Sequence, residues 1–519
     1  MTILIPKVRE TIIINPERLS ILDEPFLTFG YNQKMQDPKD GLFLFGPIND
    51  FKKPTQMRIG LVGTEEGILR YKHWIKQIVG YIPASDANPQ HHKAFPGFQS
   101  TFGTVWPLDP ICELKVSSED IYASLRLKDR HQAIFKTVGL FENVIRTYFR
   151  EEDALINLWF VVIPEDVHKL GRPKSIVPKD ESLSSSSHMT PRIGRKLLTQ
   201  PSLFTEDNAS AQIYRYELNF HHQLKARLLD IGAVIQIVRE TSLTPEDFTV
   251  HGRPLRRLQD PASIAWNLCT TAYFKAGGRP WKLADVREGV CYIGLVFKID
   301  STNPVGGNAC CGAQMFLDSG DGLVFKGAVG PWYSSTNKEF HIPYEKAKEL
   351  ITMVVETYVR EHKSPPKELF IHGKTRFNDE EWKGFRDAVT QETNLVGVRI
   401  KDATDLKLYS PANMPVLRGT AYNINSSRGY LWTKGFIPQL KTYPGREIPN
   451  PLDIQIIRGE ANLSLVMQDI LGLTKVNFNA CIFADGYPVT LRFANAVGEI
   501  LTAAPISSDL PPLPFRHYI

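Results

Sequence analysis

Short, continuous runs of apolar residues alternate with amphipathic stretches through the first half of this chain, and this alternation most constrains its fold. The runs MRIGLVGT (57–64) and NLWFVVI (157–163) are each followed by residues with helical apolar spacing. In a third case the order is reversed, because HHQLKARLLD (221–230) precedes AVIQIV (233–238). Strands that are buried on both faces have continuous apolar sequences, and helices between them make the strands parallel. Residues 51–284 are therefore predicted to form an α/β domain with a doubly wound parallel sheet.

A different pattern begins near residue 285. The stretches VCYIGLVFKID (290–300) and CGAQMFLDSGDGLVFKG (311–327) predict successive strands, the second folding into a hairpin that turns at DSGDG. A helix, an apolar strand and another helix are predicted next, from YEKAKELITMVVETYVREH, KELFIHG and NDEEWKGFRDAV. Asn378 and Glu381 have the spacing of a capping box. This order of elements is typical of a ribonuclease-H-like α/β domain.

Two segments lack a clear periodic pattern. Residues 1–50 end in a Pro/Gly/Asp-rich stretch that favours strand and loop over helix. Residues 179–202, KDESLSSSSHMTPRIGRKLLTQPS, are rich in serine and basic residues. We expect this insertion to be a surface loop or partly disordered, and a regulatory phosphorylation site within it is a less favoured alternative.

Composition excludes some classes of protein. The chain has 519 residues, of which 42% are hydrophobic and 23% charged, as in soluble globular proteins. No apolar run approaches the roughly 18 residues of a membrane span, and the N-terminus lacks a signal-peptide pattern, so a cytoplasmic location without membrane contact is expected. The net charge of +5 permits a nucleic-acid partner without requiring one. The six cysteines show no CxxC spacing, which favours reduced, mostly buried thiols: Cys112, Cys269, Cys291, Cys310, Cys311 and Cys481.

Several polar residues suggest a binding site for an anion. His221 and Lys225 are four residues apart, so they share one face of the predicted helix. Gln236 interrupts the apolar strand that follows, and Lys275 lies near the end of another predicted helix, before two glycines. Taken singly, such residues more often belong to a solvated face or complement a helix dipole.

In this order, however, the residues resemble a known family. An HxxxK motif, a Gln in the next strand, the motif NLCxxxxxKxGG (267–278) and the dipeptide PW (280–281) are similar to the MID domain of Argonaute proteins. The resemblance implies that the 5′-phosphate of a guide strand is held by four side chains: His221, Lys225, Gln236 and Lys275. A second lysine of the family motif is replaced by Thr271, which leaves the pocket less basic. The resemblance also implies that the terminal carboxylate of Ile519 reaches the guide phosphate through Mg²⁺, with Gln236 as a further metal ligand.

The resemblance covers most of the chain. DEPFLTFGYNQKMQDPKDGLFLFGP (23–47) and FPGF (95–98) are similar to the opening of short prokaryotic Argonautes, and YPVTLRFANAVGEIL (487–501) with PPLPFRHYI (511–519) is similar to the close of a PIWI domain. No room remains for N and PAZ domains. The implied organisation is a lead segment over 1–50, a Rossmann-like MID domain over 51–284 and a ribonuclease-H-like PIWI domain over 285–519.

The resemblance predicts that this PIWI domain is inactive. An active domain needs carboxylates that hold two metal ions about 4 Å apart. The three positions that can be located carry other residues: Val296, Lys374 and Asn495. Asp300 is four residues beyond Val296, about 13 Å along a strand, and is too far away to replace it. The remaining nearby acids are expected in turns or at a helix start: Asp318, Asp321 and Asp379.

Inactive short Argonautes act with an APAZ-domain partner that carries a TIR, Sir2 or nuclease effector. The resemblance therefore implies a heterodimer in which a guide RNA detects single-stranded DNA of plasmids or phages, and it leaves oligomerisation on activation open. Target pairing would activate the partner, most often an NAD⁺-depleting enzyme, and cause abortive infection as antiviral defence. Two alternatives stay open: an active guided nuclease with a rearranged metal site, and a nucleotide-binding enzyme suggested by GLVGTEEG (60–67), which is not a GxGxxG motif.

Overall fold

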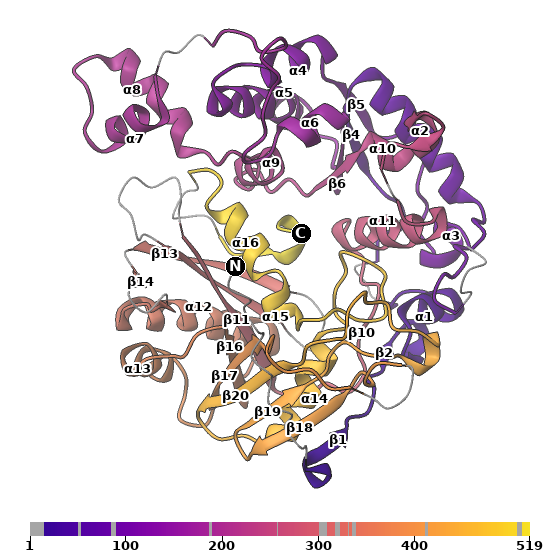
Figure 1. Ribbon diagram of the computed structural model, residues 1–519, viewed down its shortest axis with the longest axis vertical. Coiled ribbons are helices and arrows are strands. Elements are labelled where there is room, and N and C mark those ends of the chain that lie inside the picture. Colours follow the sequence, from indigo (N-terminus) through magenta and orange to yellow (C-terminus); the bar gives the residue numbers. More distant parts are fainter. Residues whose placement is uncertain are drawn as a thin grey trace, which may run out of the picture.

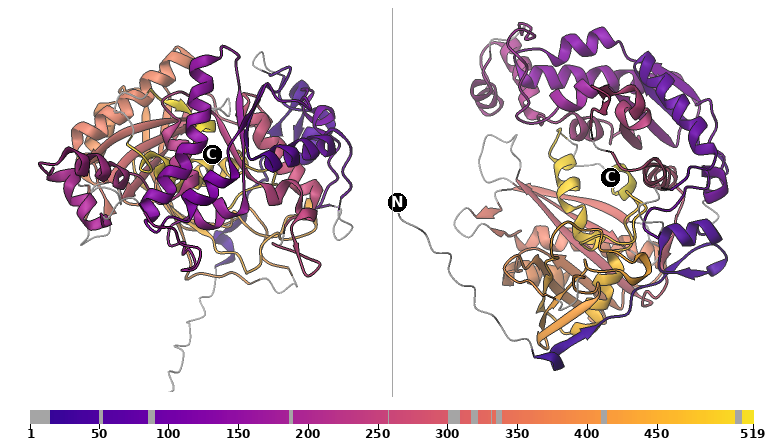
Figure 2. Two further views of the ribbon diagram at one scale, coloured as in Figure 1. Left: turned by 90° about the horizontal axis from the view of Figure 1, so that it is seen from above. Right: turned by 45° about the vertical axis from the view of Figure 1, so that its right-hand side comes forward.

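The structure is a computed structural model of the chain. It describes residues 15–49, 53–84, 90–185, 189–256, 258–299, 309–316, 322–330, 332–334, 339–409, 414–505 and 511–519. Two sheets dominate the described residues, and the C-terminal segment lies between them (Figures 1 and 2). No described helix combines the length and the apolar character needed to cross a bilayer.

The first sheet confirms the doubly wound parallel arrangement. It has the order β5-β4-β6-β7, and every neighbouring pair is parallel. Its strands are β4 (Ile59–Gly63), β5 (Cys112–Lys115), β6 (Leu158–Ile163) and β7 (Ile235–Arg239). The first connection runs to one side of β4 and the next to the other side, which is the strand order of a doubly wound fold.

Helices cover both faces of this sheet. Successive side chains of a strand point to opposite faces, so each buried strand contributes to two cores. In β6, Trp159 and Val161 pack into the core formed with α5 and α9, whereas Phe160 and Val162 face the core that contains α2 and α11. The bounds of these helices are α2 (Glu65–Val79), α5 (Arg130–Glu151), α9 (Phe220–Arg227) and α11 (Pro261–Lys275).

The second sheet has ten strands in the order β1-β18-β19-β20-β17-β16-β11-β12-β13-β21. Strands β11, β12 and β13 are antiparallel neighbours, whereas β16 and β17 run parallel to β11. This confirms the predicted order of hairpin strands before alternating helices and strands; the turn itself, residues 317–321, lies outside the described residues. The core strands are β11 (Val290–Ile299), β12 (Ala309–Phe316), β13 (Gly322–Gly330), β16 (Glu368–Gly373) and β17 (Asn394–Asp402). The others are β1 (Leu19–Ile21), β18 (Thr420–Asn425), β19 (Arg428–Leu431), β20 (Leu452–Arg458) and β21 (Leu513–Pro514).

Helices also cover both faces of the large sheet. Side chains of α12 (Tyr344–His362) and α13 (Asp379–Asp387) pack into the core on one face. On the other face lie α14 (Leu463–Leu473), α15 (Val489–Arg492) and α16 (Ala494–Leu501). A Cβ atom on Gly294 of β11 would lie 1.8 Å from the carbonyl oxygen of Thr490, so the glycine allows α15 to approach the strand. The capping box at the start of α13 is confirmed.

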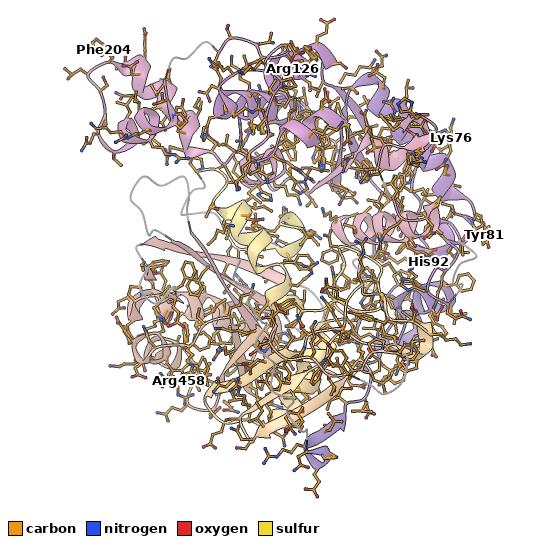
Figure 3. All side chains as sticks on the ribbon, in the orientation of Figure 1. Lys76, Tyr81, His92, Arg126, Phe204 and Arg458 are labelled. Atoms are coloured by element: carbon orange, nitrogen blue, oxygen red, sulfur yellow. The ribbon has the colours of Figure 1, made fainter. Side chains whose placement is uncertain are left out.

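Two predictions of irregular structure are wrong in part. Within the lead segment, Pro38–Phe45 forms helix α1, because Asp37 caps its first turn and Pro38 has the backbone angle a helix start requires. At the end of the serine-rich insertion, Pro191–Thr199 forms helix α7, capped by Thr190. With α8 (Thr205–Ala211), this helix forms the protrusion seen in Figures 1 and 3.

The lead segment joins both halves of the molecule. Its strand β1 pairs with β18 at the edge of the ten-stranded sheet. Further along, β2 (Leu27–Thr28) pairs with β3 (Lys34–Met35) and with β10 (Lys282–Leu283), which immediately precedes the large sheet.

Candidate functional site

A pocket of about 600 Å³ opens at the carboxyl ends of β6 and β7. Ligands of open α/β sheets bind at this edge, outside the carboxyl ends of the strands. Polar and charged side chains form much of the wall: His168, Arg172, Asn219, His221, His222, Arg239 and Ser242. The pocket is therefore a basic site at the position where the fold favours a ligand.

Helix α9 brings two histidines to this wall. The side-chain oxygen of Asn219 caps the helix and accepts hydrogen bonds from the backbone N–H groups of His221 and His222, at 3.0 and 3.3 Å. His221 lines the pocket, and its side chain is accessible to solvent there. Burial, followed by the nearby charges of Lys225 and His222, holds the pKa of His221 well below its ordinary value. At neutral pH this ring is therefore an uncharged donor and acceptor.

Behind His221 lies Lys225, one helical turn further on. Its side chain is buried, and its Nζ atom donates to the backbone oxygen of Ile519, the last residue of the chain, at 2.5 Å. Burial lowers the pKa of Lys225 to about 7. This lysine can therefore change its charge near neutral pH when a ligand enters.

Lys275 approaches from the end of α11. It is 2% exposed, and its Nζ atom donates to the backbone oxygen of Ile235 in β7 at 2.9 Å. Burial, with the nearby charge of Lys225, holds its pKa well below the ordinary value. Thr271 does not extend this cluster, because its hydroxyl donates within the helix to the carbonyl oxygen of Asn267.

Gln236 carries an unsatisfied acceptor. Its amide nitrogen donates weakly to the carbonyl oxygen of Ile237 at 3.4 Å, whereas its Oε1 atom is buried and has no hydrogen-bond partner. Buried acceptors are rarely left unpaired, and such an exception points to an absent ligand, ion or water.

The C-terminal tail is packed into the molecule. Phe515 is buried and its ring lies 5.5 Å from that of Phe316 and 5.1 Å from that of Phe493. Tyr518 and Ile519 are buried as well, at 2% and 6% exposure. This packing brings the terminal carboxyl group to Lys225.

The structure thus brings some of the predicted residues together. Lys225 contacts Ile519 directly, and the charges of Lys225, Lys275 and His221 influence one another. Only His221 among them lies in the pocket wall; Gln236 and the two lysines lie outside that lining.

Four basic residues of the wall were missed by sequence reasoning: His168, Arg172, His222 and Arg239. Arg239 ends β7 and pairs with Glu165 through two nitrogens: Nη2 lies 2.5 Å from Oε1, and Nε lies 3.1 Å from Oε2. Arg172 bonds to the ring of His168 at 3.1 Å. Burial, followed by Arg239 and Arg172, lowers the pKa of His168 to about 4. The available signal was the position of Arg239 at the end of β7 and of His168 and Arg172 in the segment that follows β6, since strand ends of parallel sheets hold ligands.

The donor set is compatible with Mg²⁺, which prefers oxygen ligands. The terminal carboxyl group of Ile519 and the unpaired Oε1 atom of Gln236 are both oxygen donors. Elsewhere, the described residues contain no cluster of three His, Cys, Asp or Glu side chains suited to a metal.

The positions predicted to lack catalytic carboxylates lie on three separate elements. Val296 is in β11 opposite Gly312, and Asn495 is in α16; their side chains are outside the described structure. Lys374 follows β16 and is exposed, with its Nζ atom 5.9 Å from the ring centroid of Tyr487. Among the acids that could substitute, Asp300, Asp318 and Asp321 fall outside the described residues, whereas Asp379 opens α13 and pairs with Arg458.

Solved structures with a similar fold are Argonautes. The Clostridium butyricum Argonaute, solved with a guide DNA bearing a 5′ deoxycytidine and a 19-mer target DNA, superposes with a TM-score of 0.59 and 15% identity, covering 94% of this chain and 53% of that chain. Aa-Ago, solved with an externally bound siRNA, gives a TM-score of 0.53 and 12% identity, covering 96% of this chain and 56% of that one. No protein-family model matches the sequence, and no curated protein matches it. The chain has an Argonaute fold and spans about half the length of these two Argonautes.

Proposed function

We propose that this protein holds the 5′-phosphate of a guide RNA and uses the guide to recognise single-stranded DNA of plasmids or phages. The observation that carries the proposal is a pair of buried lysine amines beside the pocket. Lys225 and Lys275 are both buried; Lys225 donates to the terminal oxygen of Ile519, whereas Lys275 donates to the backbone oxygen of Ile235. An anion bound here would allow both amines to hold their protons.

A terminal phosphate suits these groups better than a carboxylate does. It carries nearly two negative charges at pH 7 and three oxygens that accept charge-assisted hydrogen bonds. Two lysines, the ring of His221 and the amide of Gln236 are donors of the required kinds. Binding would raise the depressed pKa values of the lysines, because a nearby negative charge favours their protonated forms.

Mg²⁺ is proposed as a cofactor of this site, held by the terminal carboxylate of Ile519 and by Gln236. When bound, it would supply two positive charges against the phosphate oxygens. The lysines of this chain would then orient the guide end, and His221 would contact it from the pocket wall.

We further propose that the protein does not cut its target. A valine, a lysine and an asparagine replace the carboxylates of the family at residues 296, 374 and 495, and none of these residues is an acid that could hold two metals. In this proposal, target pairing instead activates an APAZ-domain partner with a TIR or Sir2 effector, or a nuclease in some systems. NAD⁺ depletion by that partner would give abortive-infection immunity.

The decisive experiment is to express the chain with its neighbouring gene and sequence the nucleic acid that copurifies. We expect short RNAs with 5′-phosphates in the wild type and their depletion in the Lys225→Ala/Lys275→Ala double variant. Lys76→Ala is a matched control, because Lys76 is exposed on α2, away from the pocket. Recovery of short DNAs instead of RNAs would show that the guide is DNA. An unchanged set of copurified nucleic acids in the double variant would refute the proposal that these lysines hold the guide phosphate.

The two alternatives have their own tests. Cleavage of a guide-matched strand with Mg²⁺ or Mn²⁺ would favour an active nuclease with a rearranged site. The nucleotide-binding alternative is disfavoured by Thr64, which already caps the helix after GLVGT by accepting from the backbone N–H of Gly67. Tight NAD⁺ binding by the isolated chain would support the nucleotide-binding alternative instead.

A further inference from the structure

A chain of polar contacts leads from the pocket wall to the first strand of the large sheet. His222 in the wall faces two carboxylates: its Nδ1 atom lies 3.1 Å from Glu217 and its Nε2 atom 3.4 Å from Glu499. Glu499 belongs to α16, and its other oxygen pairs with the Nζ atom of Lys298 at 3.1 Å. Lys298 belongs to β11. We call these residues, Glu217, His222, Glu499 and Lys298, the α9–β11 bridge.

The bridge joins elements that are far apart in the sequence. Helix α16 packs against both α9 and β11, and it lies between the two sheets in Figure 1. A backbone hydrogen bond from the N–H of Glu217 to the carbonyl oxygen of Ala503 reinforces the contact next to the bridge. Lys298 lies two residues after Val296, and Glu499 lies one helical turn after Asn495. The bridge therefore ends beside two of the positions where active Argonautes carry carboxylates.

Partial burial makes these contacts energetically relevant. The side chains of His222, Glu499 and Lys298 are between 20% and 34% exposed. Charges at such positions are screened less than fully exposed ones, although more than buried ones. Effects of several-fold on a neighbouring equilibrium are therefore expected from each pair.

The carboxylates of the α9–β11 bridge and a phosphate in the pocket compete for hydrogen bonds from the ring of His222. His222 has two ring nitrogens, and both already face carboxylates. A phosphate in the pocket offers a further acceptor to the same ring. Because Lys298 shares Glu499 with His222, the lysine weakens the hold of Glu499 on the ring and frees it for the phosphate.

We propose that Lys298 and Glu499 are positioning residues that couple occupation of the phosphate pocket to strand β11. Glu499 restrains His222, and Lys298 relieves that restraint. By reciprocity, a bound phosphate transfers Glu499 from His222 to Lys298 and strengthens the link between α16 and β11. This inference rests on the proposed function, since it concerns the same pocket.

A double-variant cycle tests the coupling directly. The measured quantity is the ratio of the Kd for a 5′-hydroxyl oligoribonucleotide to the Kd for the same oligoribonucleotide with a 5′-phosphate. Lys298→Met is expected to lower this ratio by about threefold to tenfold, and Glu499→Gln to raise it by a similar factor. In the Glu499→Gln background, Lys298→Met should have no further effect.

Two controls separate coupling from a general change in charge. Lys298→Arg keeps the charge and should preserve the wild-type ratio. Lys346→Met removes a lysine from an exposed ion pair with Glu349 on α12, where the N–O distance is 2.6 Å, and should also leave the ratio unchanged.

The possible results discriminate between the two proposals. If the wild type prefers the 5′-phosphate but the effects of Lys298→Met and Glu499→Gln are additive, the bridge is refuted and the pocket survives. If the wild type shows no preference for the 5′-phosphate, the pocket itself is refuted, and the bridge with it.

Discussion

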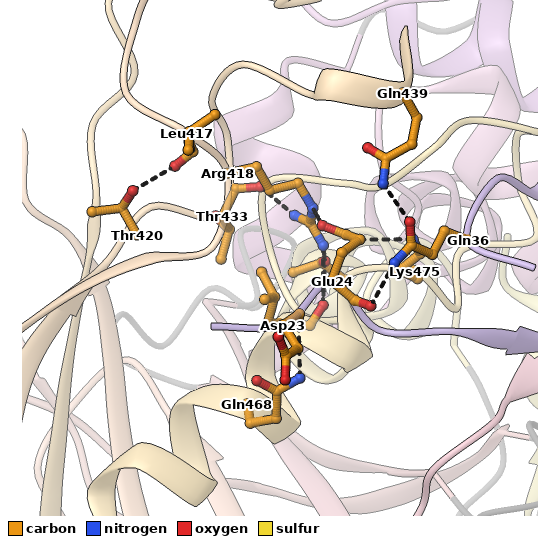
Figure 4. A network of polar contacts seen from close by, with 12 residues as sticks. Asp23, Glu24, Gln36, Leu417, Arg418, Thr420, Thr433, Gln439, Gln468 and Lys475 are labelled. Atoms are coloured by element: carbon orange, nitrogen blue, oxygen red, sulfur yellow. Dashed lines mark hydrogen bonds and ion pairs between the residues drawn. The ribbon is translucent and has the colours of Figure 1, made fainter. Parts of the chain in front are cut away.

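Two clusters of buried cations in this molecule differ in how their charges are balanced. In the clamp formed by Glu24, Arg418 and Lys475, the carboxylate lies between two cations (Figure 4). Its oxygens contact the Nε atom of Arg418 at 2.9 Å and the Nζ atom of Lys475 at 2.7 Å. Beside the proposed phosphate pocket, Lys225 donates to the terminal oxygen of Ile519 and Lys275 to the backbone oxygen of Ile235, and neither lysine forms an ion pair with a described side-chain carboxylate. The clamp is internally satisfied, whereas the pocket is not.

The donors of Arg418 show how complete the clamp is. Besides Glu24, the guanidinium donates to Thr474 Oγ1 at 2.8 Å, to the carbonyl oxygen of Leu471 at 3.2 Å and to that of Thr433. Burial would raise the pKa of Glu24, but Arg418 and Lys475 outweigh it and lower the pKa. Burial lowers the pKa of Lys475 to about 8, with Glu24 opposing the shift.

The contrast separates a structural site from a binding site. A buried cation with a permanent carboxylate partner holds two segments together, here the lead segment and the large sheet. Buried cations with too few acceptors are costly in the free protein and become favourable when an anion binds. The lack of a paired side-chain carboxylate among the described residues, rather than the presence of lysine, therefore supports the pocket as the proposed ligand site.

The largest effect is expected from breaking the clamp. Glu24→Gln leaves Arg418 and Lys475 buried without a countercharge, and removing one partner of a buried ion pair is strongly destabilising. We expect the free energy of unfolding to fall by about 3 kcal/mol in urea denaturation. Glu17→Gln, an exposed change in the same segment, should have no measurable effect. A loss no greater than in that control would show that the clamp is not structural.

The matching change in the pocket should have the opposite effect on stability. Lys275→Met removes a buried amine and keeps most of its volume, so the ligand-free protein should become more stable by about 1 kcal/mol. The same change should weaken binding of a 5′-phosphorylated guide by about tenfold or more, because a charge-assisted hydrogen bond of about 1.5–3 kcal/mol is lost. Loss of stability together with unchanged guide affinity would make Lys275 a structural residue like those of the clamp.

A smaller effect concerns pH. The folded protein holds the pKa of Lys225 at about 7, below that of an exposed lysine in the unfolded chain. Between these values the unfolded state binds more protons, so this residue makes the stability of the guide-free protein rise with pH above about 7, by at most about 1.4 kcal/mol per pH unit. The Lys225→Met variant should show a shallower rise. A bound 5′-phosphate should flatten the wild-type rise as well, because it keeps the lysine protonated.

Features of the fold and of the site that depend on residues close together in the sequence could be predicted, whereas those that depend on distant residues could not. The parallel sheet followed from apolar runs such as LWFVVI, because burial on both faces leaves a continuous apolar sequence. Helix α7 was missed since serine-rich composition outweighed the cap at Thr190. The pair Glu24–Arg418 joins residues 394 positions apart, and no periodicity reports such a contact. Of the residues predicted through family resemblance, His221 lies in the pocket wall. The ion pair of Arg239 with Glu165 depends on how two strands end side by side.

The smallest effect is expected at the three positions that are proposed to lack catalytic acids. Val296→Asp with Lys374→Asp places one carboxylate in β11 and one just after β16, but Asn495 still offers no charged ligand for the metals. Two metal ions held about 4 Å apart require more negative charge than two carboxylates provide. We therefore expect no guide-dependent product from the double variant with Mg²⁺ or Mn²⁺, measured on a labelled target strand. Adding Asn495→Asp is the sharper comparison, because cleavage only in the triple variant would show that the missing charge alone separates this chain from a nuclease. Cleavage by the wild type would instead mean that other carboxylates supply the metal ligands.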